Sequence, residues 1–254
     1  MIEKIQTALW FLQRPSHWRH AVSLTQRKFL PDYDTQNLRA NARSWAAEHA
    51  LPIKEALAEL GIVGDANGID SELIVEGTER AAKSEVEMGG PGDLDLLVDA
   101  VRLTKARRVI ETGVAYGWSS LAILDSIARN GGGQLVSVDM PYPKMGNEDF
   151  VGIAVSDRLR DRWTIIRQPD RPGLEKAIAA FDGNIDLCHY DSDKSWWGRA
   201  YAFPLLWDAL VPGGLFISDD IQDNLFFAEF VKSKKLPFAV TMSEGKFVGL
   251  MRKV

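Results

Sequence analysis

The stretch Arg107-Arg-Val-Ile-Glu-Thr-Gly-Val-Ala-Tyr-Gly-Trp-Ser-Ser120 decides the fold of this chain. Its first four residues pass from charged to apolar, as a strand entering a sheet does, and they are followed by Glu111 and two glycines, Gly113 and Gly117. The apolar spacing from Trp118 to Ile127 is helical. A strand, a glycine-rich turn and a helix N-terminus in this order predict the nucleotide-binding corner of an open α/β sheet.

The spacing of the turn, E-x-G-x-x-x-G, differs from the G-x-G-x-x-G turn that brings backbone against a pyrophosphate. It favours a cofactor without a phosphate, such as S-adenosylmethionine. Glycines let the backbone approach the ribose and the amino acid part of such a cofactor, and carboxylates accept hydrogen bonds from hydroxyls or from the ammonium. The same spacing disfavours an NAD-dependent enzyme.

Strand and helix patterns alternate through the rest of the chain. Strands are expected at residues 107–110, 134–139, 163–167, 185–190 and 215–218, with helices near residues 118–127, 174–181, 196–210 and 224–234, and a closing β-hairpin at residues 238–242 and 247–251. These patterns predict an α/β fold with a Rossmann-like open seven-stranded sheet. The sheet is expected to be mostly parallel with a C-terminal antiparallel hairpin, and helices should cover both faces.

The N-terminal third is expected to be a helical cap or extension, residues 1–85, ahead of a main domain at residues 86–254. Residues 61–77 are expected to form a loop because glycine, aspartate and asparagine interrupt them, and Thr78–Met88 a helix. We expect Trp10, Phe11 and Trp18 to pack against the main domain or against a second copy in a homodimer, rather than on a membrane surface.

Composition sets limits on the class of protein. The chain has 254 residues, of which 46% are hydrophobic and 26% charged, as in ordinary soluble globular proteins. No apolar run approaches the roughly 20 residues of a membrane span. The single cysteine, Cys188, excludes an intrachain disulfide and fits a reducing cytoplasm. The net charge of −5 argues against a nucleic-acid partner.

Acidic residues follow the expected strands, at the sheet edge where open α/β folds bind ligands: Asp139 after the second, Asp191 after the fourth, and Asp219 and Asp220 after the fifth. Asp139 is expected to hold ribose hydroxyls, with a turn cap as the alternative. Three clustered carboxylates repel each other unless they share a cation, and oxygen ligands suit Mg²⁺. The alternative is that Asp219 and Asp220 cap the next helix.

Three segments in order, Glu111–Ser119, Asp191–Lys194 and Pro212–Asp220, together resemble class I S-adenosylmethionine-dependent methyltransferases. Within that class the chain is most similar to small-molecule O-methyltransferases of the catechol and caffeoyl-CoA type and their bacterial relatives. The resemblance covers residues 88–254 and not the residues before them. It implies S-adenosylmethionine as cofactor, a divalent cation such as Mg²⁺, and O-methylation of a small-molecule hydroxyl.

The resemblance also implies roles for individual residues. Asp191, Asp219 and Asp220 would ligate the metal, and Lys194 would be the general base beside Asp191. The plant and animal enzymes have asparagine at the position of Asp220, so the ion preference here is open. Met88 to Gly90 would form a flap over the cofactor. The cofactor contacts implied are Met88, Gly89, Glu111, Thr112, Gly113, Tyr116, Gly117, Ser119, Asp139, Met140 and Asp191.

Several alternatives stay open at this point. Lys194 would be a mere ion-pair partner of Asp191 or Asp193 if acidic neighbours raise its pKa. His189 is expected to be a packed, hydrogen-bonded residue. Two other functions also remain: a relative of the same fold and metal set with another reaction, such as a hydroxylase of antibiotic biosynthesis, and a non-catalytic binding protein that retains the cofactor fold.

Overall fold

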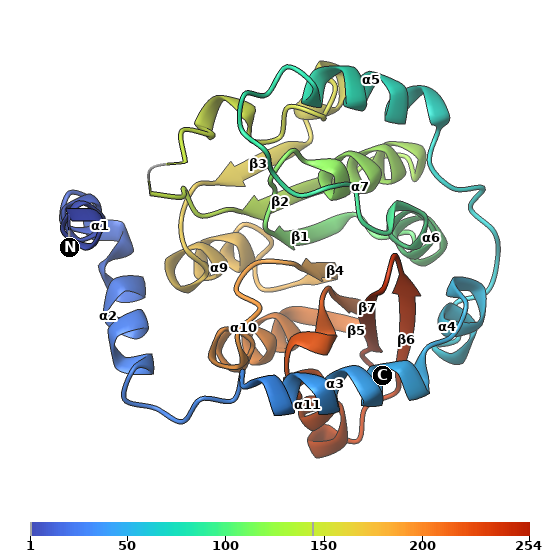
Figure 1. The fold of residues 1–254 in the computed structure, drawn as a ribbon. Coiled ribbons are helices and arrows are strands. Elements are labelled where there is room, and N and C mark those ends of the chain that lie inside the picture. Colours follow the sequence, from blue (N-terminus) through green and yellow to red (C-terminus); the bar gives the residue numbers. More distant parts are fainter. Residues whose placement is uncertain (1, 144) are drawn as a thin grey trace.

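The computed structural model describes residues 2–143 and 145–254, with side chains from residue 6 onward, and centres on a seven-stranded sheet of order β3-β2-β1-β4-β5-β7-β6 (Figure 1). Its strands are β1 (Arg108–Thr112), β2 (Gln134–Val138), β3 (Trp163–Ile166), β4 (Ile185–Tyr190), β5 (Leu210–Ser218), β6 (Phe238–Ser243) and β7 (Lys246–Arg252). Strands β1 to β5 pair in parallel. The hairpin β6–β7 adds to β5 in antiparallel fashion, which confirms the predicted fold.

Strand residues alternate between two hydrophobic cores, one on each face of the sheet. On one face, Val109 and Leu187 pack with helices α6 (Leu94–Thr104) and α7 (Trp118–Arg129). On the other, Ile110 and Cys188 pack with α9 (Asp170–Ala179), α10 (Trp196–Ala209) and α11 (Phe226–Lys234). The short α8 (Asp157–Arg160) precedes β3. Both faces are thus covered, as a mostly parallel sheet requires.

The N-terminal helices α3 (Gln36–His49), α4 (Ile53–Glu59) and α5 (Ser71–Ala81) belong to these same cores. Ala46 of α3 lies in one core, and Leu57 of α4 and Leu73 of α5 lie in the other. The backbone N–H of Leu51 donates to the carbonyl of Val240 in β6, at 2.8 Å. Three of the helices within residues 1–85 therefore wrap around the sheet.

Helix α5 corrects two predictions, because residues 61–77 are not all loop and residues 82–88 are not helical. Asp70 begins the helix by accepting a hydrogen bond from the Glu72 N–H at 3.0 Å. Gly77, which suggested a loop, lies inside the helix. A Cβ atom there would lie 2.7 Å from the Trp118 ring, so the glycine allows close packing of α5 on α7.

Helices α1 (Ile2–Leu12) and α2 (Trp18–Arg27) form an arm at the side of the molecule (Figure 1). Arg19 pairs with Glu175 of α9 at 3.0 Å. Of the three aromatics expected to pack, Trp10 and Phe11 contact each other edge to face, whereas Trp18 is half exposed. The homodimer remains a prediction. No helix in the described part of the chain is long and apolar enough to cross a membrane.

Candidate active site

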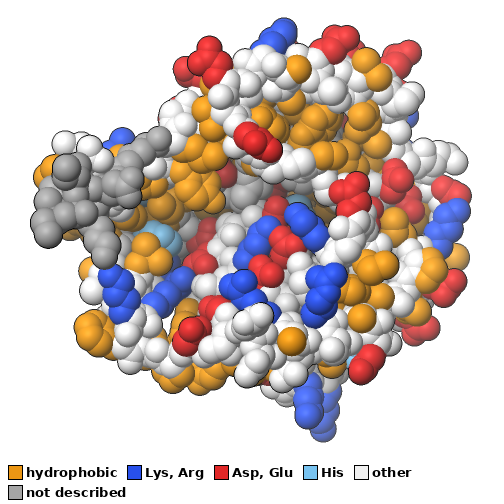
Figure 2. All heavy atoms as spheres, viewed as in Figure 1, with side chains coloured by type: hydrophobic (Ala, Val, Ile, Leu, Met, Phe, Trp, Pro, Cys, Tyr) orange, Lys and Arg blue, Asp and Glu red, His pale blue; other side chains and the backbone are white. Residues whose placement is uncertain are grey.

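A cavity of about 480 Å³ opens at the carboxyl ends of β1, β2, β4 and β5. The strand order reverses between β1 and β4, which is where open α/β sheets bind ligands. Figure 2 shows acidic and basic side chains meeting in a hollow of the molecule, with hydrophobic side chains beside them. The lining includes Met88, Gly89, Asp93, Gly113, Trp118, Ser119, Asp139, Tyr142, His189, Asp191, Lys194, Asp219, Asp220 and Lys246.

The glycine-rich turn forms one wall of this cavity. Gly113 has a φ of +79°, and a Cβ atom there would lie 2.3 Å from the carbonyl oxygen of Asp191. Only glycine allows this approach, so the turn brings the end of β1 against the end of β4. Gly117 begins α7 in the left-handed region. The turn therefore joins the two strand ends that carry the site.

The segment Met88–Gly90 lines the cavity, as the resemblance implies, and Tyr116 holds it. The Met88 N–H donates to the Tyr116 hydroxyl at 3.2 Å, and that hydroxyl donates to the carbonyl of Val86 at 2.7 Å. Asn147 also donates to the Met88 sulfur at 3.3 Å. Tyr116 thus supports the segment from outside the lining.

Asp139 lies at the end of β2 with both carboxylate oxygens engaged. Oδ1 accepts a hydrogen bond from the Val114 N–H of the glycine-rich turn at 2.9 Å. Oδ2 pairs with Arg167, which also pairs with Glu148 at 2.6 Å. Burial lowers the pKa of Arg167. Arg167 is not among the predicted site residues, although it is the last residue of the third expected strand, which pairs with the second.

Glu111 is fully buried and does not line the cavity. Its carboxylate accepts hydrogen bonds from the hydroxyls of Ser119, Ser120 and Ser137, each at 2.6 Å. Ser137 in turn accepts from the Trp163 indole N–H at 2.8 Å. Glu111 therefore ties the start of α7 to β2 beneath the cavity.

The predicted cofactor residues divide into two groups in the structure. Met88, Gly89, Gly113, Ser119, Asp139 and Asp191 line the cavity. The other five, which are Glu111, Thr112, Tyr116, Gly117 and Met140, lie outside the lining. All eleven lie in segments that border the cavity or adjoin its lining, but not every member of a segment faces the cavity.

The opposite wall carries a network of charges. The Lys194 ammonium lies 2.8 Å from Asp191 Oδ1 and also pairs with Asp220. His189 Nε2 lies 3.2 Å from Asp219 Oδ1, and its Nδ1 lies 3.9 Å from Glu111. Two cationic side chains therefore engage the three aspartates that were predicted to share a metal ion.

These pairs shift the pKa values of the network. Burial raises the pKa of Asp191 to about 6, with the neighbouring Asp219 adding to the effect. Burial opposes the charged form of His189, but Asp219 and Glu111 outweigh it and raise its pKa to about 10. For Lys194, burial is likewise outweighed by Asp191 and Asp220, which raise its pKa. These surroundings favour the ion-pair alternative for Lys194 over the general-base role.

The donor set does not fit the predicted Mg²⁺ ion. Within residues 2–143 and 145–254, no group of three or more His, Cys, Asp or Glu side chains is placed to hold a metal. Lys194 occupies the space between Asp191 and Asp220, while His189 holds Asp219. The three predicted ligands lie on one wall of the cavity, but their partners there are the Lys194 ammonium and the His189 imidazole.

A buried arginine, which was not among the predicted site residues, positions this wall. Arg199 of α10 donates to the backbone carbonyls of Asp219 at 3.0 Å and Asp220 at 2.7 Å. It also donates to Asn224 at 3.3 Å, and Asn224 donates to the carbonyl of Lys194 at 2.9 Å. A lone arginine in the otherwise apolar stretch of α10 was the available signal, because a buried charge needs partners.

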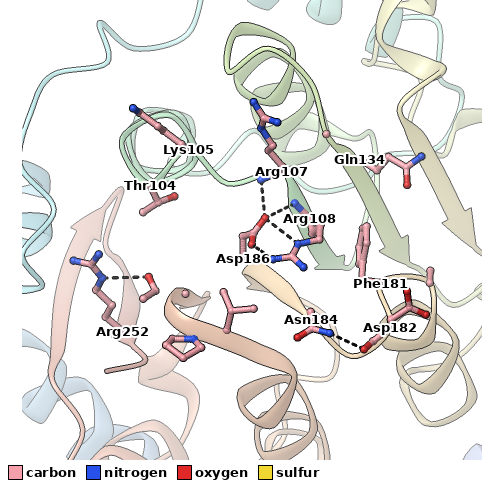
Figure 3. A pocket seen from close by; sticks show the side chains of 16 residues that line it. Thr104, Lys105, Arg107, Arg108, Gln134, Phe181, Asp182, Asn184, Asp186 and Arg252 are labelled. Carbon is pink, nitrogen blue, oxygen red and sulfur yellow. Dashed lines mark hydrogen bonds and ion pairs between the residues drawn. The ribbon is translucent and has the colours of Figure 1, made fainter.

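A second, open cavity of about 920 Å³ lies at the other end of the sheet (Figure 3). Arg108 and Asp186 form an ion pair in its wall at 2.6 Å, and the backbone N–H of Arg107 donates to the same carboxylate at 3.0 Å. This cavity lies at the amino ends of the strands, whereas ligands of open α/β sheets bind at the carboxyl ends. The smaller cavity is therefore the candidate active site.

Comparisons with known proteins agree with this geometry. Residues 110–221 match a family model described as a methyltransferase domain, and no curated protein matches the sequence. An O-methyltransferase from Bacillus cereus in complex with SAH (S-adenosylhomocysteine) is 18% identical, with a TM-score of 0.54, and the match covers 80% of this chain and 100% of that one.

Two further solved structures show the same likeness. An SAH-bound methyltransferase from Podospora anserina is 16% identical, with a TM-score of 0.54 and 89% and 98% of the two chains covered. An O-methyltransferase from Streptomyces achromogenes involved in tomaymycin synthesis, in complex with SAM, is 15% identical, with a TM-score of 0.53 and 74% and 92% covered. At these identities the likeness shows the fold. Residues 110–221 therefore match a methyltransferase domain, and the chain has the fold of class I S-adenosylmethionine-dependent methyltransferases.

Proposed function

We propose that the protein transfers a methyl group from S-adenosylmethionine to the hydroxyl oxygen of a small molecule. One observation carries the proposal: a single cavity joins the glycine-rich turn and Asp139 at one end to Asp191 and Lys194 at the other. The first end suits the donor, and the second suits a hydroxyl that must lose a proton.

In this proposal the donor lies along the glycine-rich turn. Asp139 accepts hydrogen bonds from the ribose hydroxyls, which compete with Arg167 for its Oδ2 atom. The amino acid carboxylate lies near Ser119, in the first turn of α7, where backbone N–H groups lack helical partners. Met88 and Gly89 cover the cofactor. S-Adenosylmethionine is the only cofactor that the proposal requires.

The reaction is an in-line displacement, in which the acceptor oxygen forms a bond to the methyl carbon as the bond from that carbon to sulfur breaks. The sulfonium leaves as a neutral thioether. The chain's task is to align the oxygen with the methyl group and to remove the hydroxyl proton. Asp191 lines the cavity and can accept this proton, while the paired Lys194 stabilises the charge that develops on oxygen.

The test combines calorimetry of SAH binding with transfer of labelled methyl to a panel of phenols and catechols. Asp139→Asn should weaken SAH binding roughly 10- to 100-fold, because a charged acceptor is lost. Asp191→Asn should leave SAH binding nearly unchanged and slow transfer by about 100-fold or more. Asp208→Asn, on the exposed side of α10, is the matched control and should change neither quantity.

Two results would count against this function. If the wild-type protein binds neither SAH nor S-adenosylmethionine, the donor site is wrong. If it binds them but no hydroxyl compound accepts labelled methyl, O-methylation is wrong, and the reaction is a different one on the same fold.

A further inference from the structure

Lys194 stands where two acidic strand ends meet. Its ammonium lies 2.8 Å from Asp191, at the end of β4, and pairs with Asp220, at the end of β5. The third carboxylate of the wall, Asp219, is held by His189 at 3.2 Å. Each aspartate that could ligate a metal ion is therefore engaged by the Lys194 ammonium or the His189 imidazole.

Backbone hydrogen bonds fix the segments that carry this ammonium and its acidic partners. Asn224 holds the Lys194 backbone carbonyl at 2.9 Å, and the buried Arg199 holds the carbonyls of Asp219 and Asp220. A metal ion between Asp191 and Asp220 would have to displace the Lys194 ammonium or lie beside it. Two adjacent positive charges, the ion and the ammonium, repel each other strongly in a partly buried site.

We propose that the Lys194 ammonium is the resident cation of this site and that methyl transfer proceeds without a divalent metal ion. This inference rests on the proposed function. An ammonium has three N–H donors. Among the described residues, Lys194 donates a hydrogen bond to Asp220 and forms an ion pair with Asp191 at 2.8 Å. A donor remains for the acceptor oxygen, because about a third of the Lys194 side chain is exposed (33%) and it lines the cavity.

The role assigned to Lys194 is electrostatic. As the acceptor hydroxyl gives its proton to Asp191, negative charge grows on the oxygen, and the ammonium donates a hydrogen bond to it. The oxygen then forms its bond to the methyl carbon while the sulfur takes the electron pair of the broken bond. Lys194 keeps all its protons throughout, so no further base or metal is needed to balance the step.

The first experiment titrates the full chain, loaded with SAH, with Mn²⁺ and follows free Mn²⁺ by electron paramagnetic resonance. We expect the Mn²⁺ to remain free, and methyl transfer to be equally fast with and without EDTA. Binding of one Mn²⁺ per chain, or loss of transfer in EDTA with recovery on adding Mg²⁺, would overturn the proposal.

The second experiment removes the positive charge of Lys194. Lys194→Met should slow methyl transfer about 100-fold, as loss of one oxyanion donor does, while SAH affinity stays unchanged. Lys194→Arg, which keeps a cation, should retain much more of the wild-type rate. Lys176→Met, which removes an exposed lysine of α9, should retain the full wild-type rate. Transfer by Lys194→Met at the rate of Lys176→Met would overturn the proposal. If the wild-type chain methylates no hydroxyl compound, the proposed function fails, and the Mn²⁺ titration alone decides whether the site takes a metal.

Discussion

Replacement of Glu111 by glutamine separates a structural role of this residue from contact with the cofactor. Its carboxylate accepts three hydroxyl hydrogen bonds at 2.6 Å, from Ser119, Ser120 and Ser137. A hydrogen bond to a charged group is worth about 1 kcal/mol more than a neutral one, so three amount to roughly 3 kcal/mol. Relief from burying a charge offsets part of this, and we expect Glu111→Gln to lower the free energy of unfolding by about 2 kcal/mol.

The assay measures urea unfolding and SAH binding on the same preparations. Because Glu111 lies outside the cavity lining, its replacement should change the SAH dissociation constant by less than about threefold, equivalent to well under 1 kcal/mol. Ser120→Ala removes one of the three donors and serves as the matched variant. It should lower the free energy of unfolding by about 1 kcal/mol and leave SAH binding unchanged.

The opposite result would refute this reasoning. If Glu111→Gln keeps the wild-type unfolding free energy but weakens SAH binding about tenfold or more, equivalent to at least 1.4 kcal/mol, the carboxylate contacts the cofactor. That is the role the family resemblance implies for it.

Three further predictions concern the surroundings of the site. Arg27→Met breaks the pair with Asp193 at 2.7 Å and should speed tryptic cleavage between α2 and α3, whereas Arg19→Met, at an exposed pair, should not. Gly77→Ala should lower the urea-unfolding free energy by about 1 kcal/mol, since overpacking against Trp118 outweighs the gain in helix propensity. Burial raises the pKa of Asp170 to about 6, so its stabilising contribution is present below pH 4 and is lost as pH rises through 6. In the urea-unfolding assay, Asp170→Asn should therefore raise the free energy of unfolding by at most about 3 kcal/mol at pH 8. The increase should be smaller at pH 5, where the folded protein still holds the Asp170 proton.

The sheet was predictable because its strands are short apolar runs bounded by strong turn signals. Strand β4 begins and ends where the sequence placed it, at Ile185 and Tyr190. The N-terminal helices were harder, since a glycine inside a helix gives the same signal as a glycine in a loop. Gly77 is explained only by Trp118, which lies 41 residues further along the chain and on another helix.

The site was predictable as a set of strand ends but not as a set of contacts. Parallel strands bring their carboxyl ends to one edge, so Asp139, Asp191 and Asp219 had to lie near one another. Which partner each carboxylate takes depends on side-chain paths that no spacing in the sequence determines. Lys194 pairs with Asp191, and Arg167 pairs with Asp139.

The N-terminal segment, which lies outside the family resemblance, contacts the loop that carries Lys194. Arg27 holds Asp193 at 2.7 Å, and Asp34 accepts a hydrogen bond from the Trp196 N–H at 3.0 Å, on the two sides of Lys194. Asp34 also accepts from Asn224, whose side chain holds the Lys194 carbonyl. The arm and the linker after it therefore help to fix the loop that carries the Lys194 ammonium. Replacement of Arg27 or Asp34 would therefore act on the loop that carries Lys194.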